Sequence, residues 1–134
     1  MSEEKTTTTD IAVYEEMIAA LLLNEIEWDF GDTLVLKDED EPACGAVGCA
    51  VGAWWWHRAT PEQRKAADNY SPWTELRDAL TMGEREWSLS VLGSLQYASI
   101  RNNFGVHRVS EVTCNMVIER IRQHIEELRK LEVA

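Results

Sequence analysis

Apolar residues recur with helical spacing in the first part of the chain. The pattern has three- and four-residue steps and predicts an amphipathic helix over residues 11–25, with Asp10 as its N-cap. Its apolar positions are Ile11, Tyr14, Met17, Ile18, Leu21, Leu22 and Ile26. Residues 1–9 are polar and lack this spacing, so we expect a disordered tail there.

The same pattern returns at the end of the chain. An apolar stripe of Cys114, Val117, Ile118, Ile121, Ile125 and Leu128 predicts a helix that extends to about residue 131. Ser110 is the expected cap of this helix, and His124 is expected to face solvent or to cap.

Residues 43–57 are predicted to form a central helix rich in Gly, Cys and Ala. Its small residues are four apart in two adjacent rows, Gly45–Cys49–Ala53 and Gly48–Gly52, which would let a neighbouring helix approach closely. The run 54–56 consists of three Trp that would spread over about 200° of the helix surface. At least one of them should therefore lie at a surface, at a contact with a loop or at a contact with a partner.

Turn and cap signals divide the rest of the chain into short helices. Thr60-Pro61-Glu62-Gln63 is a capping box that starts a helix over 61–68, and a second Pro-containing start predicts a helix over 72–80. Another helix should run from about residue 84 into the region 97–101, and Gly93 within it could split it into two. A turn is expected at 102–105. Residues 33–36 could be extended. The predicted fold is an all-α, compact single domain of five or six helices over 10–132.

Length and composition fit this fold. The chain has 134 residues, of which 45% are hydrophobic and 28% charged, as in a soluble protein that folds without disulfides. We find no apolar run long enough for a transmembrane helix and no secretory signal pattern. Three cysteines, an odd number, favour free thiols in a reducing compartment, so a cytoplasmic location is expected.

The net charge of −11 is concentrated in one third of the sequence. Residues 1–42 hold 13 acidic and two basic side chains, whereas residues 43–134 hold 11 of each. Direct binding of nucleic acid through this third is disfavoured, because phosphates require Lys and Arg.

The spacing of candidate catalytic and metal-binding residues matches no established motif. Cys44 and Cys49 are five residues apart, which does not fit paired zinc ligands, and the surrounding glycines lack the Lys-Ser/Thr of a phosphate loop. The acidic run 38–41 lacks the alternation of a calcium loop. We therefore predict no catalytic residue, metal or cofactor. The rival hypothesis is a thiol or metal enzyme that uses Cys44, Cys49 or Cys114 with His57 or His107.

The segment 11–57 resembles a loose group of small, uncharacterised bacterial and phage proteins. The likeness rests on Trp28-Asp29-Phe30-Gly31 followed by Cys44-Gly45-Ala46-Val47-Gly48-Cys49-Ala50-Val51-Gly52. This chain departs from the group at Ala46, where Thr is common, and in its acidic insertion before Pro42. The resemblance implies a phage or mobile-element accessory protein that binds a partner.

These observations favour a non-enzymatic binding protein that engages a basic protein surface and so inhibits or modulates it. Carboxylates would speed the encounter, and aromatic side chains would anchor it. If that partner normally binds nucleic acid, the carboxylates could stand in for phosphates. The candidate residues are Glu25, Glu27, Trp28, Asp29, Asp32, Asp38, Glu39, Asp40, Glu41 and Trp55. Alternatives are a merely solvated acidic face and a homodimer built on the Trp cluster.

Overall fold

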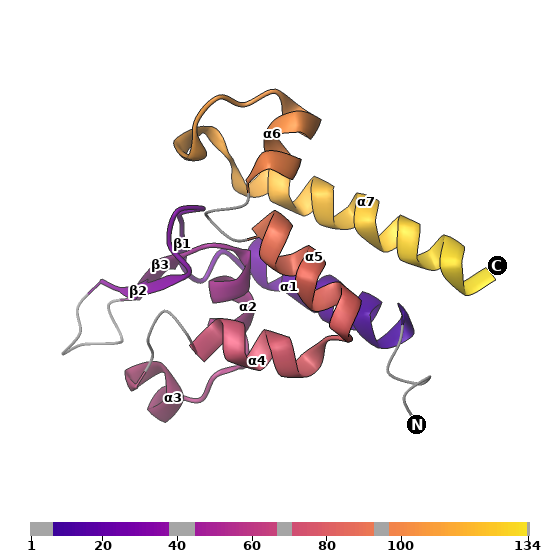
Figure 1. Ribbon diagram of the computed structural model, residues 1–134. Coiled ribbons are helices and arrows are strands. Elements are labelled where there is room, and N and C mark those ends of the chain that lie inside the picture. Colours follow the sequence, from indigo (N-terminus) through magenta and orange to yellow (C-terminus); the bar gives the residue numbers. More distant parts are fainter. Residues whose placement is uncertain (1–6, 38–44, 67–70, 93–96, 134) are drawn as a thin grey trace.

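The computed structural model describes residues 7–37, 45–66, 71–92 and 97–133, and it is mostly helical (Figure 1). Its helices are α1 (Thr7–Leu23), α2 (Ala50–Arg58), α3 (Pro61–Lys65), α4 (Ser71–Ala79), α5 (Met82–Leu92), α6 (Ala98–Phe104) and α7 (Cys114–Val133), with a 3-10 helix at Val109–Glu111. The strands β1 (Glu27–Trp28), β2 (Leu34–Leu36) and β3 (Ala46–Gly48) form a small sheet. The all-α prediction is therefore correct only in its helical majority.

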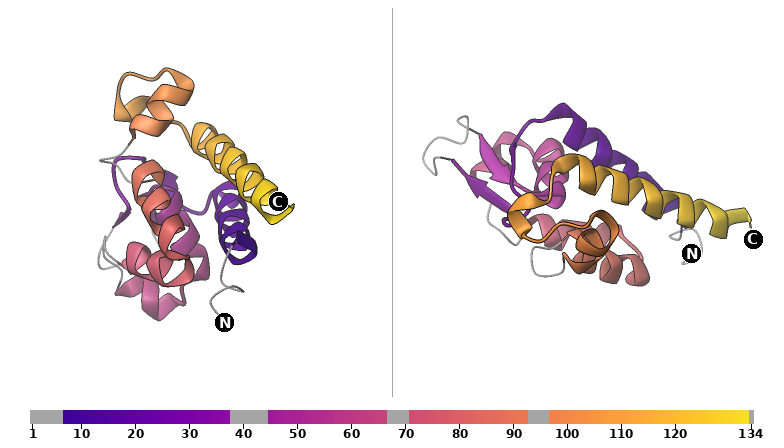
Figure 2. Two further views of the ribbon diagram at one scale, coloured as in Figure 1. Left: turned by 45° about the vertical axis from the view of Figure 1, so that its right-hand side comes forward. Right: turned by 90° about the horizontal axis from the view of Figure 1, so that it is seen from above.

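Helix α1 lies in the middle of the core, between α7 and α2, and α4 packs on the far side of α2 (Figures 1 and 2). Because α1 has neighbours on two sides, it buries Val13 and Ala20 in addition to most of its predicted apolar stripe, but Leu22 of that stripe is 62% exposed. The predicted stripe of α7 is confirmed, since its members from Val117 to Leu128 are buried. The sheet lies at the end of the molecule away from the C-terminal end of α7 (Figure 1).

The start of α1 differs from the prediction. The helix already includes residues 7–9, while residues 1–6 of the predicted tail lie outside the described residues. Asp10 is not an N-cap: it is buried within α1, and its carboxylate accepts hydrogen bonds from Thr81 N (3.1 Å) and Thr81 Oγ1 (2.7 Å). Thr81 immediately precedes α5, so Asp10 fixes the start of a distant helix instead of its own.

The predicted central helix 43–57 is wrong in its first half. Residues 46–48 form β3, which pairs in parallel with β1 and antiparallel with β2, and the helix begins only at Ala50. Gly45 has a φ of 97°, a left-handed conformation that an α-helix does not contain. A short apolar run such as this is ambiguous between a buried strand and a helix from its pattern alone.

The row formed by Gly48 and Gly52 serves a different purpose from the one predicted. The carbonyl oxygen of Thr33, not another helix, approaches Gly48 and Gly52, and it also accepts a hydrogen bond from Cys49 N at 3.3 Å. A Cβ at Gly52 would lie only 1.9 Å from that oxygen. The glycines thus admit the loop that precedes β2.

All three tryptophans of α2 are buried, so none of them lies at the surface, and the segments packed around α2 cover them. Trp54 donates its indole N–H to Glu16 of α1 at 3.0 Å, and Arg64 lies over the ring of Trp56. Trp55 is only 5% exposed. Neighbouring segments cover α2 on several sides, and a helix surrounded in this way can bury side chains around most of its circumference.

The capping box of α3 is confirmed: Thr60 and Gln63 bond reciprocally, and Pro61 occupies the first turn. At α7 the predicted cap is wrong, because Ser110 lies in the 3-10 helix and Thr113 Oγ1 accepts from Met116 N instead. The predicted turn at 102–105 is also corrected, since α6 continues through Phe104 and ends at Gly105 with a φ of 74°. The proposed break at residue 93 lies outside the described residues.

Candidate functional site

One residue of the predicted acidic surface, Glu27, lies on the outer face of the small sheet. Glu27, Val47 and Val35 are cross-strand neighbours in the order β1–β3–β2, so their side chains share one face. Val35 is 42% exposed and Glu27 is also exposed, whereas the opposite face carries the buried Leu34. The sheet therefore offers a small apolar centre to solvent, with a carboxylate at one edge.

Further carboxylates lie in the segments that lead into and out of β1. Asp29 and Asp32 are in the β1–β2 connection, and Glu25 precedes β1. Asp29 accepts a hydrogen bond from Gly31 N at 2.8 Å, which shapes that connection. We call Glu25, Glu27, Asp29 and Asp32 the acidic face. The other predicted carboxylates, 38–41, lie outside the described residues.

Few cations balance the acidic face. Lys37 approaches Glu27 at 3.5 Å, and His57 bonds to Glu25 at 2.8 Å, while Asp32 makes no ion pair within the described ranges. The carboxylates of α1 differ, because Glu15 pairs with Arg129 and Glu16 with Arg58, each at 2.7 Å. Within residues 7–37, later helices thus neutralise the exposed carboxylates of α1, whereas Asp29 and Asp32 beside the sheet make no ion pair.

The aromatic anchors fit the prediction less well. Trp28 is half-buried: its indole N–H donates to Val112 O at 2.9 Å, and its ring lies beside the buried Phe30. Trp55 is buried, so it cannot act as an exposed anchor on this surface. Burial of the Trp cluster also removes the contact surface required by the proposed homodimer.

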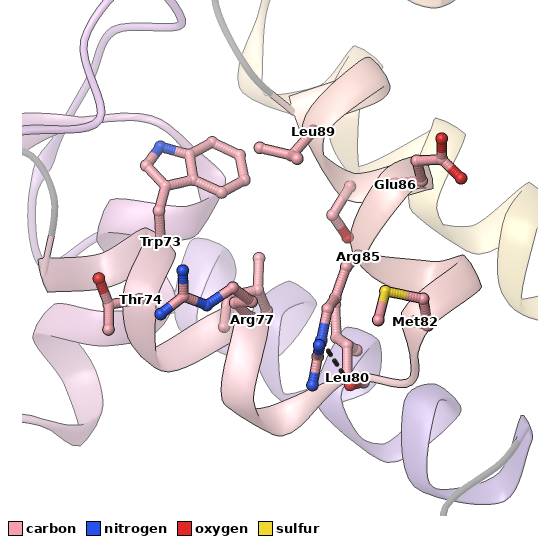
Figure 3. A pocket seen from close by; sticks show the side chains of 10 residues that line it. Trp73, Thr74, Arg77, Leu80, Met82, Arg85, Glu86 and Leu89 are labelled. Carbon is pink, nitrogen blue, oxygen red and sulfur yellow. Dashed lines mark hydrogen bonds between the residues drawn. The ribbon is translucent and has the colours of Figure 1, made fainter.

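Helices α4 and α5 enclose a groove of about 740 Å³ that was not anticipated from the sequence (Figure 3). We call it the α4–α5 groove; its main lining residues are Trp73, Leu76, Arg77, Leu80, Arg85 and Leu89. In Figure 3, Leu89 of α5 points toward the indole of Trp73 on α4. The sequence does contain one sign of this groove. Met82 and Leu89 are seven residues apart, so both apolar side chains lie on one side of α5.

A buried polar network joins α1, α5 and α7. Tyr14 OH bonds to Ser88 Oγ at 2.9 Å and donates to Glu84 Oε2 at 3.1 Å, and Glu84 in turn bonds to His124 Nε2. His124 is only 7% exposed and stacks on Trp87, so the expected solvent-facing or capping role is wrong. Burial raises the pKa of Tyr14 well above its usual range. The network satisfies its own polar groups and holds three helices together.

The thiols do not form a reactive centre with the histidines in the described part of the chain. Cys49 is buried, and burial raises the pKa of its thiol; burial also raises the pKa of the half-buried Cys114. No hydrogen bond joins either thiol to a histidine within that part, and Cys44 lies outside it. The described residues contain no group of three or more His, Cys, Asp or Glu side chains arranged to hold a metal ion.

Comparison of the chain with models of protein families, with curated proteins and with solved structures gives no match. Among the helices that the structure describes, none combines the length and apolar character needed to cross a membrane.

Proposed function

We propose that this chain is a non-enzymatic binding protein that engages a basic protein surface through its acidic face. The observation that carries the proposal is the imbalance near the sheet: Glu27 lies beside the half-buried Val47 and the exposed Val35, and Glu25, Asp29 and Asp32 are in the segments that flank β1. Among the described lysines and arginines, Lys37 makes an ion pair with one of these four carboxylates, Glu27. Negative potential around a small apolar centre suits an Arg/Lys-rich partner.

The sequence adds to this charge, since four further carboxylates directly follow Lys37 at 38–41. A partner that itself binds nucleic acid is one such target, because the carboxylates could take the place of phosphates. In that setting the chain would be a phage or mobile-element accessory protein, acting in the cytoplasm as an inhibitor or modulator. No enzymatic step is part of this proposal.

The test compares charge reversal on and away from the acidic face. Asp32→Lys changes the exposed Asp32, and Glu126→Lys makes the same change of charge at an exposed position of α7, where Glu126 pairs with Arg129. A fluorescently labelled Arg-rich peptide serves as the probe in anisotropy titrations at low and high salt, with folding checked by circular dichroism.

Reversing one charge removes an attraction and adds a repulsion, each worth about 0.2–1 kcal/mol at a surface. We expect Asp32→Lys to weaken binding by about 2- to 30-fold at low salt and Glu126→Lys to weaken it much less. Equal weakening by both variants would show that only net charge matters, and the proposed site would then be wrong. Capture of a host protein by the wild type and by Glu126→Lys, but not by Asp32→Lys, would identify the partner.

A further inference from the structure

The α4–α5 groove combines apolar walls with exposed apolar side chains at its rim. Leu76 and Leu80 are buried beneath it, while Met82 is 73% exposed and Leu89 is 54% exposed. Ser88 also lines the groove, but its hydroxyl is bonded to Tyr14. Contact with an apolar ligand would remove the exposed surface of both rim residues from water, which is favourable.

Two arginines stand on the walls of this groove, one from each helix (Figure 3). Arg85 Nε donates to Leu80 O at 3.1 Å, which holds this guanidinium at the groove. No carboxylate of the described residues lies within ion-pair distance of Arg85, and Arg77 has only its chain neighbour Asp78 at 4.0 Å. An arginine such as Arg85, with no acidic partner among the described residues, is notable in a chain with a net charge of −11.

These features restrict the occupant. A basic segment would meet Arg77 and Arg85, although Glu86 also lines the groove, and an uncharged apolar ligand would leave Arg85 without an anionic partner. A polyanion such as nucleic acid would be repelled by the net charge of the whole molecule. A small molecule with a single anionic group avoids these costs, and the groove volume falls within the usual range for small-molecule sites, about 300–1,000 Å³.

We propose that the α4–α5 groove binds a small amphiphilic carboxylate of the fatty-acid type. Its hydrocarbon chain would lie along Leu76, Leu80 and Leu89 against the indole of Trp73. Its carboxylate would pair with the guanidinium of Arg85, in the bidentate geometry that suits arginine. The groove shares no residue with the acidic face, so this inference goes beyond the proposed function and does not depend on it.

Methionine methyl groups give a site-resolved test. The full chain is labelled with ¹³C-methyl methionine and titrated with decanoate, and the Met82 signal is assigned with Met82→Leu. Met82 flanks the groove, whereas Met17 is buried in the core. We expect the Met82 signal to shift and saturate while that of Met17 stays in place. An unmoved Met82 signal would overturn the proposal, as would a shift that depends on protein concentration without ligand, since that indicates self-association.

Matched variants then test the two halves of the site. Arg85→Gln should weaken decanoate binding by about tenfold or more, but leave decanol binding unchanged, because only the carboxylate contacts the guanidinium. Arg122→Gln, an equal change of charge on α7, should leave both unchanged. Leu89→Asp, at an exposed position, should abolish binding of both ligands without unfolding the chain.

Three other results would overturn parts of the proposal. Equal loss of decanoate binding in Arg85→Gln and Arg122→Gln would overturn the assignment of the carboxylate to Arg85. Equal affinity for decanol and decanoate would overturn the preference for an anion. Tighter binding of an acidic amphipathic peptide than of decanoate, judged by the same Met82 signal, would replace the small ligand with a protein partner.

Discussion

Replacement of Gly52 by alanine tests the packing at the centre of the fold. In an ordinary helix, this change adds about 1 kcal/mol of stability, because glycine has the greater conformational freedom to lose. Here the new Cβ would meet Thr33 O at 1.9 Å and Thr33 C at 3.1 Å. Thr33 cannot move alone, since its carbonyl accepts from Cys49 N and its hydroxyl accepts from the indole of Trp73 at 2.7 Å.

The expected cost follows from these contacts. Overpacking of a filled site costs about 1–3 kcal/mol. Loss of the bond between Cys49 N and Thr33 O adds about 1 kcal/mol. After subtraction of the gain in helix propensity, Gly52→Ala should lower the free energy of unfolding by about 1–3 kcal/mol. Urea denaturation followed by far-UV circular dichroism measures this as a lower midpoint with a similar slope.

Gly83 provides the matched control. It lies in α5, and a Cβ built there meets no atom within 4 Å. Gly83→Ala should therefore raise the free energy of unfolding by about 0.5 kcal/mol. A midpoint for Gly52→Ala equal to or above that of the wild type would refute the close approach of Thr33 to α2.

Three further predictions concern buried polar groups. Burial raises the pKa of Asp10 above its ordinary value of 3.8, so the native state holds this proton more tightly and wild-type stability falls as pH rises between the two values. Asp10→Asn retains an acceptor for Thr81 N but has no group that titrates at this position. Its free energy of unfolding, relative to that of the wild type, should therefore increase from pH 3 to pH 6. A decrease would contradict the raised pKa of Asp10. Tyr14→Phe leaves the buried Ser88 hydroxyl without its phenol partner and should cost about 1–3 kcal/mol in urea denaturation, whereas wild-type stability would contradict that contact. Cys49 should react with a disulfide reagent at pH 8 only after unfolding, and native reaction at the rate of a free thiol would support the enzyme hypothesis instead.

The features that the sequence predicts correctly are local. The capping box of α3 depends on Thr60 and Gln63, three residues apart, and the buried stripe of α7 depends on steps of three and four residues. Such signals lie within one element, so they need no knowledge of the tertiary structure. The helical majority of the fold follows from them.

The features that were missed depend on distant partners. Asp10 and Thr81 are 71 residues apart, and a helix-start signal at Asp10 looks the same whether or not such a partner exists. Residues 46–48 become a strand because β1 and β2 supply hydrogen bonds on both sides. The α4–α5 groove likewise arises from the way two short helices meet, which neither helix encodes alone.

Charge illustrates the same limit and determines what remains of the binding hypothesis. In the sequence the acidic third is continuous, but Arg58 and Arg129 reach back to Glu16 and Glu15 and balance α1. Surface pairs of this kind contribute little stability, yet they cancel the local potential that would attract a partner. An acidic binding site is therefore defined by the carboxylates that folding leaves unbalanced. Within residues 7–37, Asp29 and Asp32 beside the sheet make no ion pair, and Asp32 is the exposed one, at which reversal tests the idea most directly.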